Sequence, residues 1–281
     1  MNSICPNNDT GYVIICISGG FTDQIRHYYL AYSIEKIFNR KIKYDISWYK
    51  NCGKDILGVN NRNFELSNIF TDIKFDIATE EEILIAHKYY NIMGSNNIRY
   101  TLKNKKIVYI GDNIWNLNGF GEDTNDLLDI TKILDLDKYI FPLLNENNKK
   151  IYYDIINNDF SIACHIRRTD FLIISNVNIA DNNYFKNAID LISKKINKEK
   201  ELKVYFFSDD IAWVKDKVIP LIENDYNYLI VEENNNEKGY IDFYLISLCK
   251  YHIASSGNFC IFAHKFSKFE NKILVTQNDF A

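Results

Sequence analysis

The chain alternates between short continuous apolar runs and longer stretches in which apolar residues recur every three or four positions. The first run, YVIICI at residues 12–17, is rich in β-branched residues, as expected for a parallel strand buried on both faces. The turn SGG follows, and residues 22–39 have nearly helical spacing, with Thr22 or Asp23 able to cap the first turn. A strand, a glycine turn and a helix form the first half of a βαβ unit.

The same alternation continues along the chain and predicts an α/β protein. Its 281 residues exceed what one hydrophobic core usually supports, so we expect two domains. The polar stretch NENNKK indicates the boundary between residues 1–150 and residues 151–281. Each domain is expected to be doubly wound and of Rossmann type, the two facing each other across a cleft. Further strands are predicted at residues 41–47, 106–111, 161–166, 203–208, 227–233 and 253–256, further helices at residues 81–93, 151–158, 183–196, 211–219, 239–252 and 258–267, and a loop that becomes helical at residues 118–134.

The composition is that of a folded protein that does not depend on nucleic acid as a partner. Apolar residues make up 47% and aromatic residues 15% of the chain, whereas disordered chains are poor in both. The net charge of -4 and the pI near 5.8 argue against nucleic-acid binding, which depends largely on Lys and Arg. Any anion-binding site must therefore be a small cluster of basic residues and not an extended basic surface.

The N-terminal sequence MNSICPNNDTGY lacks the basic and apolar regions of a signal peptide. No apolar run approaches the roughly 18 residues that would span a bilayer, so we expect a cytoplasmic protein. The six cysteines include no C-x-x-C pair, and we expect all of them to be reduced, with no zinc site.

Four polar clusters follow predicted strands: SGGFTDQ, HIRRTD, FFSDD and SSGN. Ligands of doubly wound domains bind at the carboxyl ends of the strands, so these clusters contain the candidate site residues. In HIRRTD, alternation places His165 and Arg167 on one side of the strand and Arg168 on the other. An arginine fork can bind a phosphate through two parallel hydrogen bonds, and Asp170 can orient one of the arginines. The alternative is a surface ion-pair cluster just past the strand.

The glycine turn SGGF lets the backbone approach a ligand, and the next helix would offer free N–H groups and the positive end of its dipole. Gly19 and Gly20 are therefore candidate binding residues, although GG also serves any tight turn. Asp23 and His27 lie on the first helical turn, and either could accept a proton. Asp23 could instead be an N-cap, which is the commoner use of Asp there.

Carboxylates stand out in two more places. Asp209 and Asp210 lack the additional ligands that Mg²⁺ requires, so we predict no metal there, and one of them can cap the following helix. Asp242 lies among apolar residues in GYIDFYLISLC, and a half-buried carboxylate needs hydrogen-bond donors. The N–H groups of a guanine edge would satisfy it, as would a helix cap or a salt bridge.

Taken in order, these blocks resemble the α-1,2-fucosyltransferases of glycosyltransferase family 11. HIRRTD fits the H-x-R-R-x-D motif of that family, and VYFFSDDIAWVKDKV resembles its second block. DFYLISLCKYHIASSGNF is similar to the third block, and ISGGFTDQIRHYYLAYSI to the glycine-rich opening block. The four blocks cover both ends of the chain and most of its second half.

The resemblance implies a GT-B arrangement, with an acceptor-side N-terminal domain and a C-terminal domain that binds the donor GDP-fucose, without a metal or other cofactor. Arg167 would contact the β-phosphate, His165 the nucleotide side and Asp242 the guanine. The acceptor would be an oligosaccharide or lipid-linked glycan that contains a β-galactoside, and peripheral association with the cytoplasmic face of the membrane through it is compatible with this. The other donor-site residues are Gly19, Gly20, Arg168, Asp170, Ser255, Ser256 and Asn258, with Asp209 and Asp210 in support.

The implied reaction is an in-line displacement that inverts β-linked GDP-fucose to an α-fucoside and releases GDP. Arg167 would stabilise the leaving diphosphate, and Asp23 or His27 would take the proton of the acceptor. The chain departs from the family where FTD replaces L-G-N, where RH replaces an apolar-polar pair, and where SSGNFCIF replaces a run with a double Trp. Two alternatives stay open: another inverting transferase that uses a GDP- or UDP-hexose, and an inactive nucleotide-binding homologue.

Overall fold

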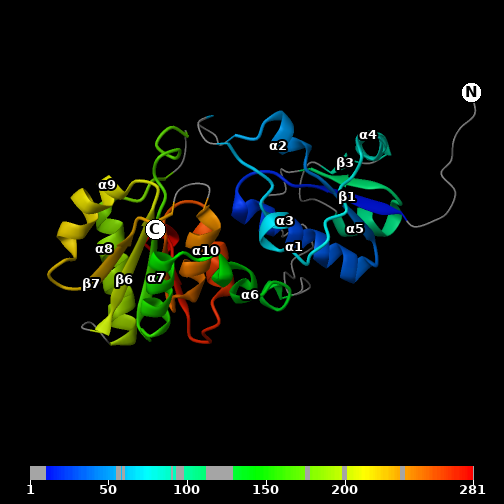
Figure 1. Ribbon diagram of the computed structural model, residues 1–281. Coiled ribbons are helices and arrows are strands. Elements are labelled where there is room, and N and C mark those ends of the chain that lie inside the picture. The colour runs from blue at the N-terminus through cyan, green and yellow to red at the C-terminus, as the bar shows by residue number, and fades with distance from the viewer. Residues whose placement is uncertain are drawn as a thin grey trace, which may run out of the picture. The chain divides into compact units, whose positions relative to one another are not determined.

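The computed structural model describes residues 11–54, 58, 61–89, 91–92, 98–111, 129–174, 178–197, 201–234 and 238–280. The chain divides into two compact units, Met1–Asp129 and Ile130–Ala281, and each contains its own parallel β-sheet (Figure 1). The predicted α/β class is therefore confirmed. Cys5 and the start of the predicted loop at residue 118 lie outside the described residues.

Unit 1 (Met1–Asp129) has a parallel sheet with the strand order β2-β1-β4-β3. The central strand β1 contains Val13, Ile14 and Ile15, which are fully buried, as its continuous apolar run predicts. The strands are β1 (Tyr12–Cys16), β2 (Lys41–Asp45), β3 (Asn91–Ile92) and β4 (Val108–Ile110), and the helices are α1 (Phe21–Phe38), α2 (Ser47–Asn51), α3 (Leu66–Ile69), α4 (Glu80–Tyr89) and α5 (Ile98–Asn104).

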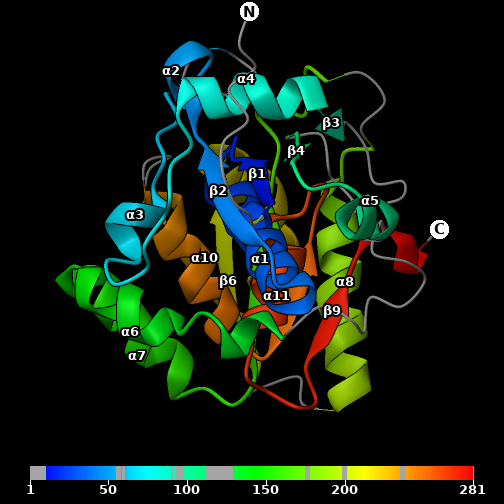
Figure 2. The ribbon, with the colours of Figure 1, turned by 90° about the vertical axis from the view of Figure 1, so that its right-hand side faces the viewer.

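Helices cover both faces of the unit 1 sheet. Ile14 and Cys16 form a buried cluster with Ala86 of α4 and Tyr109 of β4. Helix α1 contacts β1 and β2, and Figures 1 and 2 show it on the opposite side of the sheet from α4. The turn between β1 and α1 is thereby held at the carboxyl end of the central strand.

Unit 2 (Ile130–Ala281) has a five-stranded parallel sheet with the order β7-β6-β5-β8-β9. The chain leaves the central strand β5 toward β6 and β7, then returns to build β8 and β9 on the other side, so the strand order reverses between β5 and β8. The strands are β5 (Ser161–Ile166), β6 (Lys203–Ser208), β7 (Asn227–Val231), β8 (Tyr251–Ala254) and β9 (Ile273–Val275). The helices are α6 (Leu136–Ile140), α7 (Glu146–Ile156), α8 (Asn182–Ile196), α9 (Ile211–Trp213), α10 (Gly239–Leu248) and α11 (Phe259–Phe266), with short 3₁₀ or π turns at Ile130–Lys132, Phe141–Leu143, Val214–Val218, Ile219–Leu221 and Gln277–Phe280.

Two helical layers enclose the unit 2 sheet. Ile162 and Cys164 of β5 belong to one buried cluster with Phe185 and Ile189 of α8. Helix α10 packs against α7 and α11, and Figures 1 and 2 show α8 and α10 on opposite sides of β6. Each fully buried aliphatic or Phe side chain contributes about 1.5–3 kcal/mol to folding, so this core holds the strand ends firmly in place.

The elements of the structure differ from the prediction at several places. The helix predicted at residues 81–93 ends at Tyr89, before β3, and the helix predicted at residues 239–252 ends at Leu248, before β8. Strands β3 and β9 were not predicted. In α10 nearly every residue from Ile241 onward is buried, so its hydrophobic pattern carries no helical period that would mark its end, and pairing of β8 with β5 overrides local propensity.

The predicted domain boundary at residue 150 falls inside α7. Asn148, Ile151 and Ile155 of this helix are buried, and α7 packs against α10, so it belongs to unit 2. The division lies instead between Asp129 and Ile130, because the polar stretch at residues 145–150 is the start of an amphipathic helix rather than a linker.

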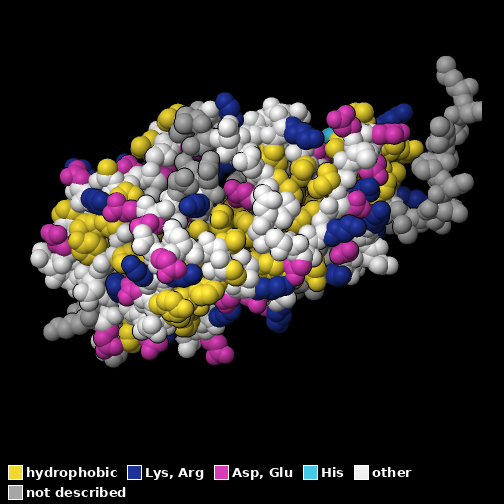
Figure 3. Space-filling view, viewed as in Figure 1, with side chains coloured by type: hydrophobic (Ala, Val, Ile, Leu, Met, Phe, Trp, Pro, Cys, Tyr) yellow, Lys and Arg dark blue, Asp and Glu magenta, His cyan; other side chains and the backbone are white. Residues whose placement is uncertain are grey.

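The surface carries both signs of charge. Figure 3 shows Lys and Arg interspersed with Asp and Glu over the described residues of the face it presents. None of the helices in the described part of the chain combines the length and the apolar character needed to cross a membrane.

Candidate active site

The polar clusters of unit 2 meet at the carboxyl ends of its parallel strands. The backbone N–H of Ser255, just after β8, donates to the carbonyl oxygen of His165 on β5 at 3.1 Å. The N–H of Arg167, in turn, donates to Oγ of Ser255 at 2.8 Å. These two hydrogen bonds join β5 to β8 at the point where the strand order reverses, the place where α/β sheets bind ligands.

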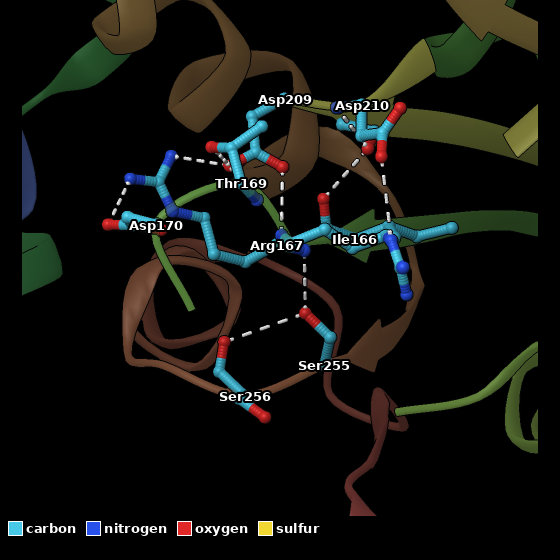
Figure 4. A network of polar contacts seen from close by, with 10 residues as sticks. Ile166, Arg167, Thr169, Asp170, Asp209, Asp210, Ser255 and Ser256 are labelled. Atoms are coloured by element: carbon cyan, nitrogen blue, oxygen red, sulfur yellow. Dashed lines mark hydrogen bonds and ion pairs between the residues drawn. The ribbon is translucent and has the colours of Figure 1, made fainter. Parts of the chain in front are cut away.

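The Arg167 side chain is held by two carboxylates (Figure 4). Its Nη2 donates to Oδ2 of Asp170 at 2.6 Å, and its Nη1 lies 3.0 Å from Oδ2 of Asp209. The two carboxylates are about 10% exposed and the arginine 26% exposed. The expected contact between Asp170 and one of the arginines is therefore confirmed. Its two partners fix the orientation of the guanidinium, whose Nε–H and second Nη hydrogens have no partner among the described residues and can bind a ligand.

Asp209 organises the loop that carries these residues. Its carboxylate accepts hydrogen bonds from the N–H of Arg168 at 2.9 Å, and from the N–H and the hydroxyl of Thr169 at 3.3 and 2.6 Å. The end of β6 thus shapes the loop after β5. The sequence pointed to Asp209 as a supporting residue but gave no indication of Thr169.

Arg168 has different surroundings from Arg167. Its guanidinium lies 3.9 Å from the ring centroid of Trp213, and its Nε is 3.5 Å from Oδ2 of Asp210. Asp210 also accepts the N–H of Trp213 at 3.1 Å and so caps α9, which confirms that one carboxylate of SDD is a helix cap. These contacts favour a structural role for Arg168, and its predicted contact with the donor stays a prediction.

The serines after β8 are used within the protein. The hydroxyl of Ser255 accepts the N–H of Arg167, and the hydroxyl of Ser256 donates to the carbonyl oxygen of Asn178 at 2.5 Å. Gly257 has a φ of +98°, and a Cβ there would lie 3.2 Å from the ring of Phe171, so glycine is required.

Asn258 differs from the two serines because it is exposed at the N-terminus of α11 and makes no side-chain capping bond. The first N–H groups of a helix have no partner within the helix. Asn258 and the start of α11 are therefore better placed than the serines to bind an anion.

His165 is uncharged at neutral pH. Burial, together with the positive charge of Arg167, lowers the pKa of His165 to about 3. Its ring stacks on Phe259, the first residue of α11, with ring centroids 4.9 Å apart. A neutral imidazole can offer a ligand one hydrogen bond but no charge.

Asp242 lies in the first turn of α10, at the same end of the sheet. Burial raises the pKa of Asp242 to about 7, although a 2.6 Å hydrogen bond from Nδ2 of Asn234 opposes the shift. The sequence prediction missed Asn234, which follows β7 in a polar segment with no recognisable motif.

In unit 1, the glycine turn connects β1 to α1. Gly19 has a φ of +76°, and a Cβ there would lie 2.6 Å from Oδ2 of Asp23. Asp23 is in the first turn of α1, where it accepts the N–H of Gly20 and pairs with Arg26 at 3.4 Å. Burial raises the pKa of Asp23 despite these contacts, which favours a role as a base. His27 is buried on the same helix.

Gln24 ends the SGGFTDQ cluster, but the sequence analysis gave it no role. It is fully buried, its Nε2 donates to the carbonyl oxygen of Asn63 at 2.9 Å, and its Oε1 accepts the N–H of Glu65 at 2.8 Å. It therefore ties the glycine turn to residues 63–65. Its place at the end of the SGGFTDQ cluster was the available signal.

Unit 1 also has a pocket of about 450 Å³ beyond the end of β2. None of the predicted site residues lines it. The lining residues are Ile46, Phe64, Ser67, Thr71, Asp72, Ile73, Lys74, Phe75 and Ile77.

Within the described residues, no three His, Cys, Asp or Glu side chains group as a metal site requires. Asp209 and Asp210 instead contact the loop after β5 and the start of α9. A reaction without a metal stays a prediction.

Comparison with solved structures and family models identifies the protein class. The fold is that of the GT-B glycosyltransferases: a mutant of Arabidopsis thaliana FUT1 in complex with GDP is similar with a TM-score of 0.53 and 12% identity, over 96% of this chain and 71% of that chain. The model of glycosyl transferase family 11 matches residues 59–279, and the chain belongs to this family.

Two curated relatives from Escherichia coli cover most of the chain. The O-antigen biosynthesis glycosyltransferase WbnK is 25% identical over 297 aligned residues, which include 93% of this chain and 92% of that protein. An alpha-1,2-colitosyltransferase is 24% identical over 262 aligned residues, with 88% of this chain and 84% of that protein. The resemblance to family 11 found in the sequence is confirmed.

Proposed function

We propose that this family 11 glycosyltransferase transfers fucose from GDP-fucose to the 2-position of a β-galactoside in a glycan, with inversion and without a metal. The observation that carries the proposal is Arg167, held by two carboxylates where the strand order of unit 2 reverses. Asp242 supports guanine as the base, because its carboxylate lies at the same end of the sheet and can accept two N–H groups.

In the proposed reaction, a hydroxyl oxygen of the acceptor attacks the anomeric carbon of fucose. The bond from that carbon to the β-phosphate oxygen breaks, and GDP leaves with the bonding electrons. The free N–H groups of Arg167 and the start of α11 would bind the diphosphate more strongly as its charge grows, which lowers the barrier. The acceptor proton would pass to a base, for which Asp23 is the first candidate and His27 the second.

The acceptor is proposed to be a bacterial surface glycan. The support is the relative WbnK, which is described as a glycosyltransferase of O-antigen biosynthesis and matches nearly the whole chain. A β-galactoside within such a glycan, free or lipid-linked, would be the substrate.

Colitose is a second candidate for the transferred sugar. The observation that favours it is the similarity to an alpha-1,2-colitosyltransferase along 88% of the chain. Colitose is fucose without the 3-hydroxyl group, so the two donors would differ at one position of the sugar and share the nucleotide.

The test is to incubate the purified protein with a β-galactoside in EDTA and, in parallel, GDP-fucose, GDP-colitose and a UDP-hexose. Release of GDP with a fucosylated product supports the proposal, and faster turnover of GDP-colitose supports the second candidate. Turnover of the UDP-hexose alone would contradict a GDP donor. Binding of GDP without transfer to any galactoside would identify an inactive homologue.

A further inference from the structure

A second polar network in unit 2 involves α7, the segment after β7, and α10. It consists of Asn148 in the first turn of α7, Asn234 and Asp242. Asn148 is fully buried, although it belongs to the polar stretch that the sequence analysis took for a domain boundary. A buried amide needs partners, and its partner here is 86 residues away in the sequence.

The two asparagines hydrogen-bond to each other reciprocally. Nδ2 of Asn148 donates to Oδ1 of Asn234 at 2.9 Å, and Nδ2 of Asn234 donates back to Oδ1 of Asn148 at 3.1 Å. Nδ2 of Asn234 also donates to Oδ1 of Asp242 at 2.6 Å. Both hydrogens of the Asn234 amide are thus used, and the amide cannot rotate without losing all of its bonds.

This arrangement leaves the two oxygens of Asp242 in different situations. Oδ1 accepts from Asn234, whereas Oδ2 has no hydrogen bond to any residue that the structure describes. Because Asn234 is itself held by the buried Asn148, the hydrogen bond to Oδ1 restrains the rotation of the carboxylate before any ligand arrives.

We infer that Asn234, held by Asn148, is a positioning residue that orients the Asp242 carboxylate so that it accepts both the N1–H and the 2-amino group of guanine. The inference rests on the proposed function, in which Asp242 contacts the base. The hydrogen-bonded chain from α7 to α10 would then set the preference of the protein for guanine over bases that lack the 2-amino group.

The orientation matters because two parallel hydrogen bonds require the carboxylate to lie in the plane of the base. A carboxylate free to rotate can still accept one N–H group, but it loses the second bond. Inosine diphosphate has the N1–H and lacks the 2-amino group, so the ratio of GDP to IDP affinity measures the second bond. UDP has the same ribose and diphosphate but a different base, so its affinity measures the part of the site that binds the ribose and the diphosphate.

The experiment measures binding of GDP, IDP and UDP to the full-length protein by calorimetry. For the unmodified protein we expect GDP to bind about tenfold more tightly than IDP, as one extra hydrogen bond to a charged group provides. In Asn234→Ala this ratio should fall toward one, while the affinity for UDP stays the same. Asn147→Ala is the matched control, because Asn147 is the exposed neighbour of Asn148 on α7, and it should leave all three affinities unchanged.

The possible results separate the inference from the proposed function. If the unmodified protein does not prefer GDP to IDP and UDP, the assignment of a guanine site is wrong, and the inference falls with it. If it prefers GDP and Asn234→Ala keeps the same ratio, only the positioning role is overturned. Should Asn234→Ala fail to fold, Asn148→Leu has a similar shape and removes the hydrogen bonds to Asn234 without adding a charge, and an unchanged GDP to IDP ratio in that variant would overturn the inference equally.

Discussion

Arg167 and Arg168 are neighbours in the sequence with opposite surroundings in the fold. Arg167 is held by two carboxylates at the end of the unit 2 sheet, whereas Arg168 stacks on Trp213. Successive residues of an extended segment point to opposite sides, so the two arginines have different partners and serve different purposes. The motif predicts that both arginines contribute to the site. Their contacts favour a ligand-binding role for Arg167 and a role for Arg168 in stabilising the fold.

Replacing Arg167 should separate binding from folding. Arg167→Lys keeps the positive charge beside Asp170 and Asp209 but loses the fork, so transfer should fall by about 10²-fold or more while the melting temperature changes little. Arg167→Ala should in addition lower the free energy of unfolding by about 1–3 kcal/mol, because the largely buried Asp170 loses its hydrogen-bond donor and Asp209 loses one of its donors. Rates of GDP release and thermal melts check both effects.

Arg168→Ala is the contrasting variant. It loses the contact with Trp213, worth about 0.5–2 kcal/mol, and should reduce stability more than turnover. A loss of transfer as large as that of Arg167→Lys, in a protein that still melts normally, would contradict the structural role of Arg168.

The pKa of Asp242 leads to a pH prediction. A carboxylate that accepts N–H groups binds GDP in its ionised form, and the pKa of Asp242 is about 7 because of burial. GDP affinity should therefore be highest above pH 7 and fall by up to about tenfold for each unit below it, as the carboxyl takes up a proton. Calorimetry between pH 5.5 and 8.5 checks this, with UDP to correct for titration of the diphosphate. In Asp242→Asn, the affinities for GDP and UDP should depend on pH in the same way.

Asp23 is the candidate base of unit 1. Asp23→Asn can still accept the N–H of Gly20 but cannot take a proton, so kcat should fall by about 10²- to 10⁴-fold with GDP binding unchanged. The measurement is the pH profile of kcat for both proteins. Full activity with an unaltered profile would show that Asp23 is not the base, and His27→Gln would then be the next variant.

At the scale of elements, the loop after β5 takes its shape from the end of β6. Asp209 accepts the N–H groups of Arg168 and Thr169 and the hydroxyl of Thr169, and it also pairs with Arg167. The candidate phosphate-binding residues are thus arranged by two parallel strands together, and neither strand alone would orient Arg167.

Asp209→Asn should therefore loosen this loop. An amide cannot accept at both positions, so we expect faster amide hydrogen exchange at Arg168 and Thr169 and a loss of about 1–3 kcal/mol of stability. Asp210→Asn is the matched control, because Asn caps a helix about as well as Asp. Equal exchange rates in the two variants would show that Asp209 does not organise the loop.

At the scale of the whole molecule, the boundary between the units lies before α6 and α7, so both helices belong to unit 2. Asp137 of α6 accepts the hydroxyl of Tyr244 at 2.5 Å, and Asn148 of α7 belongs to the network of Asp242. Both helices thus complete unit 2, although the composition of residues 145–150 indicated a boundary there.

Two fragments test this division. The fragment of residues 130–281 should fold and bind GDP, whereas the fragment of residues 151–281 lacks the partners of Tyr244 and Asn234 and should melt at a clearly lower temperature with weaker GDP binding. Circular dichroism melts and calorimetry provide the comparison. Equal stability of the two fragments would move the boundary back to residue 150.

The sequence by itself determined the α/β class, the positions of most strands and the gathering of polar residues at strand ends. These features are local: burial on both faces gives continuous apolar runs, and each run ends where a polar cluster begins. The order of the motifs was also enough to identify the family, because the residues required for the chemistry occur at a characteristic spacing in the sequence.

Only the tertiary structure decided which of these residues act together. The end of α10, the place of α7 and the partners of Arg167, Asn148 and Asp242 all depend on segments far apart in the sequence. A fully buried helix has no periodicity to mark its end, and a polar residue looks the same in a sequence whether it is solvated or buried against a distant partner. Packing of the helices on the unit 2 sheet settles both questions, because a buried polar group is stable only where the fold brings it a partner.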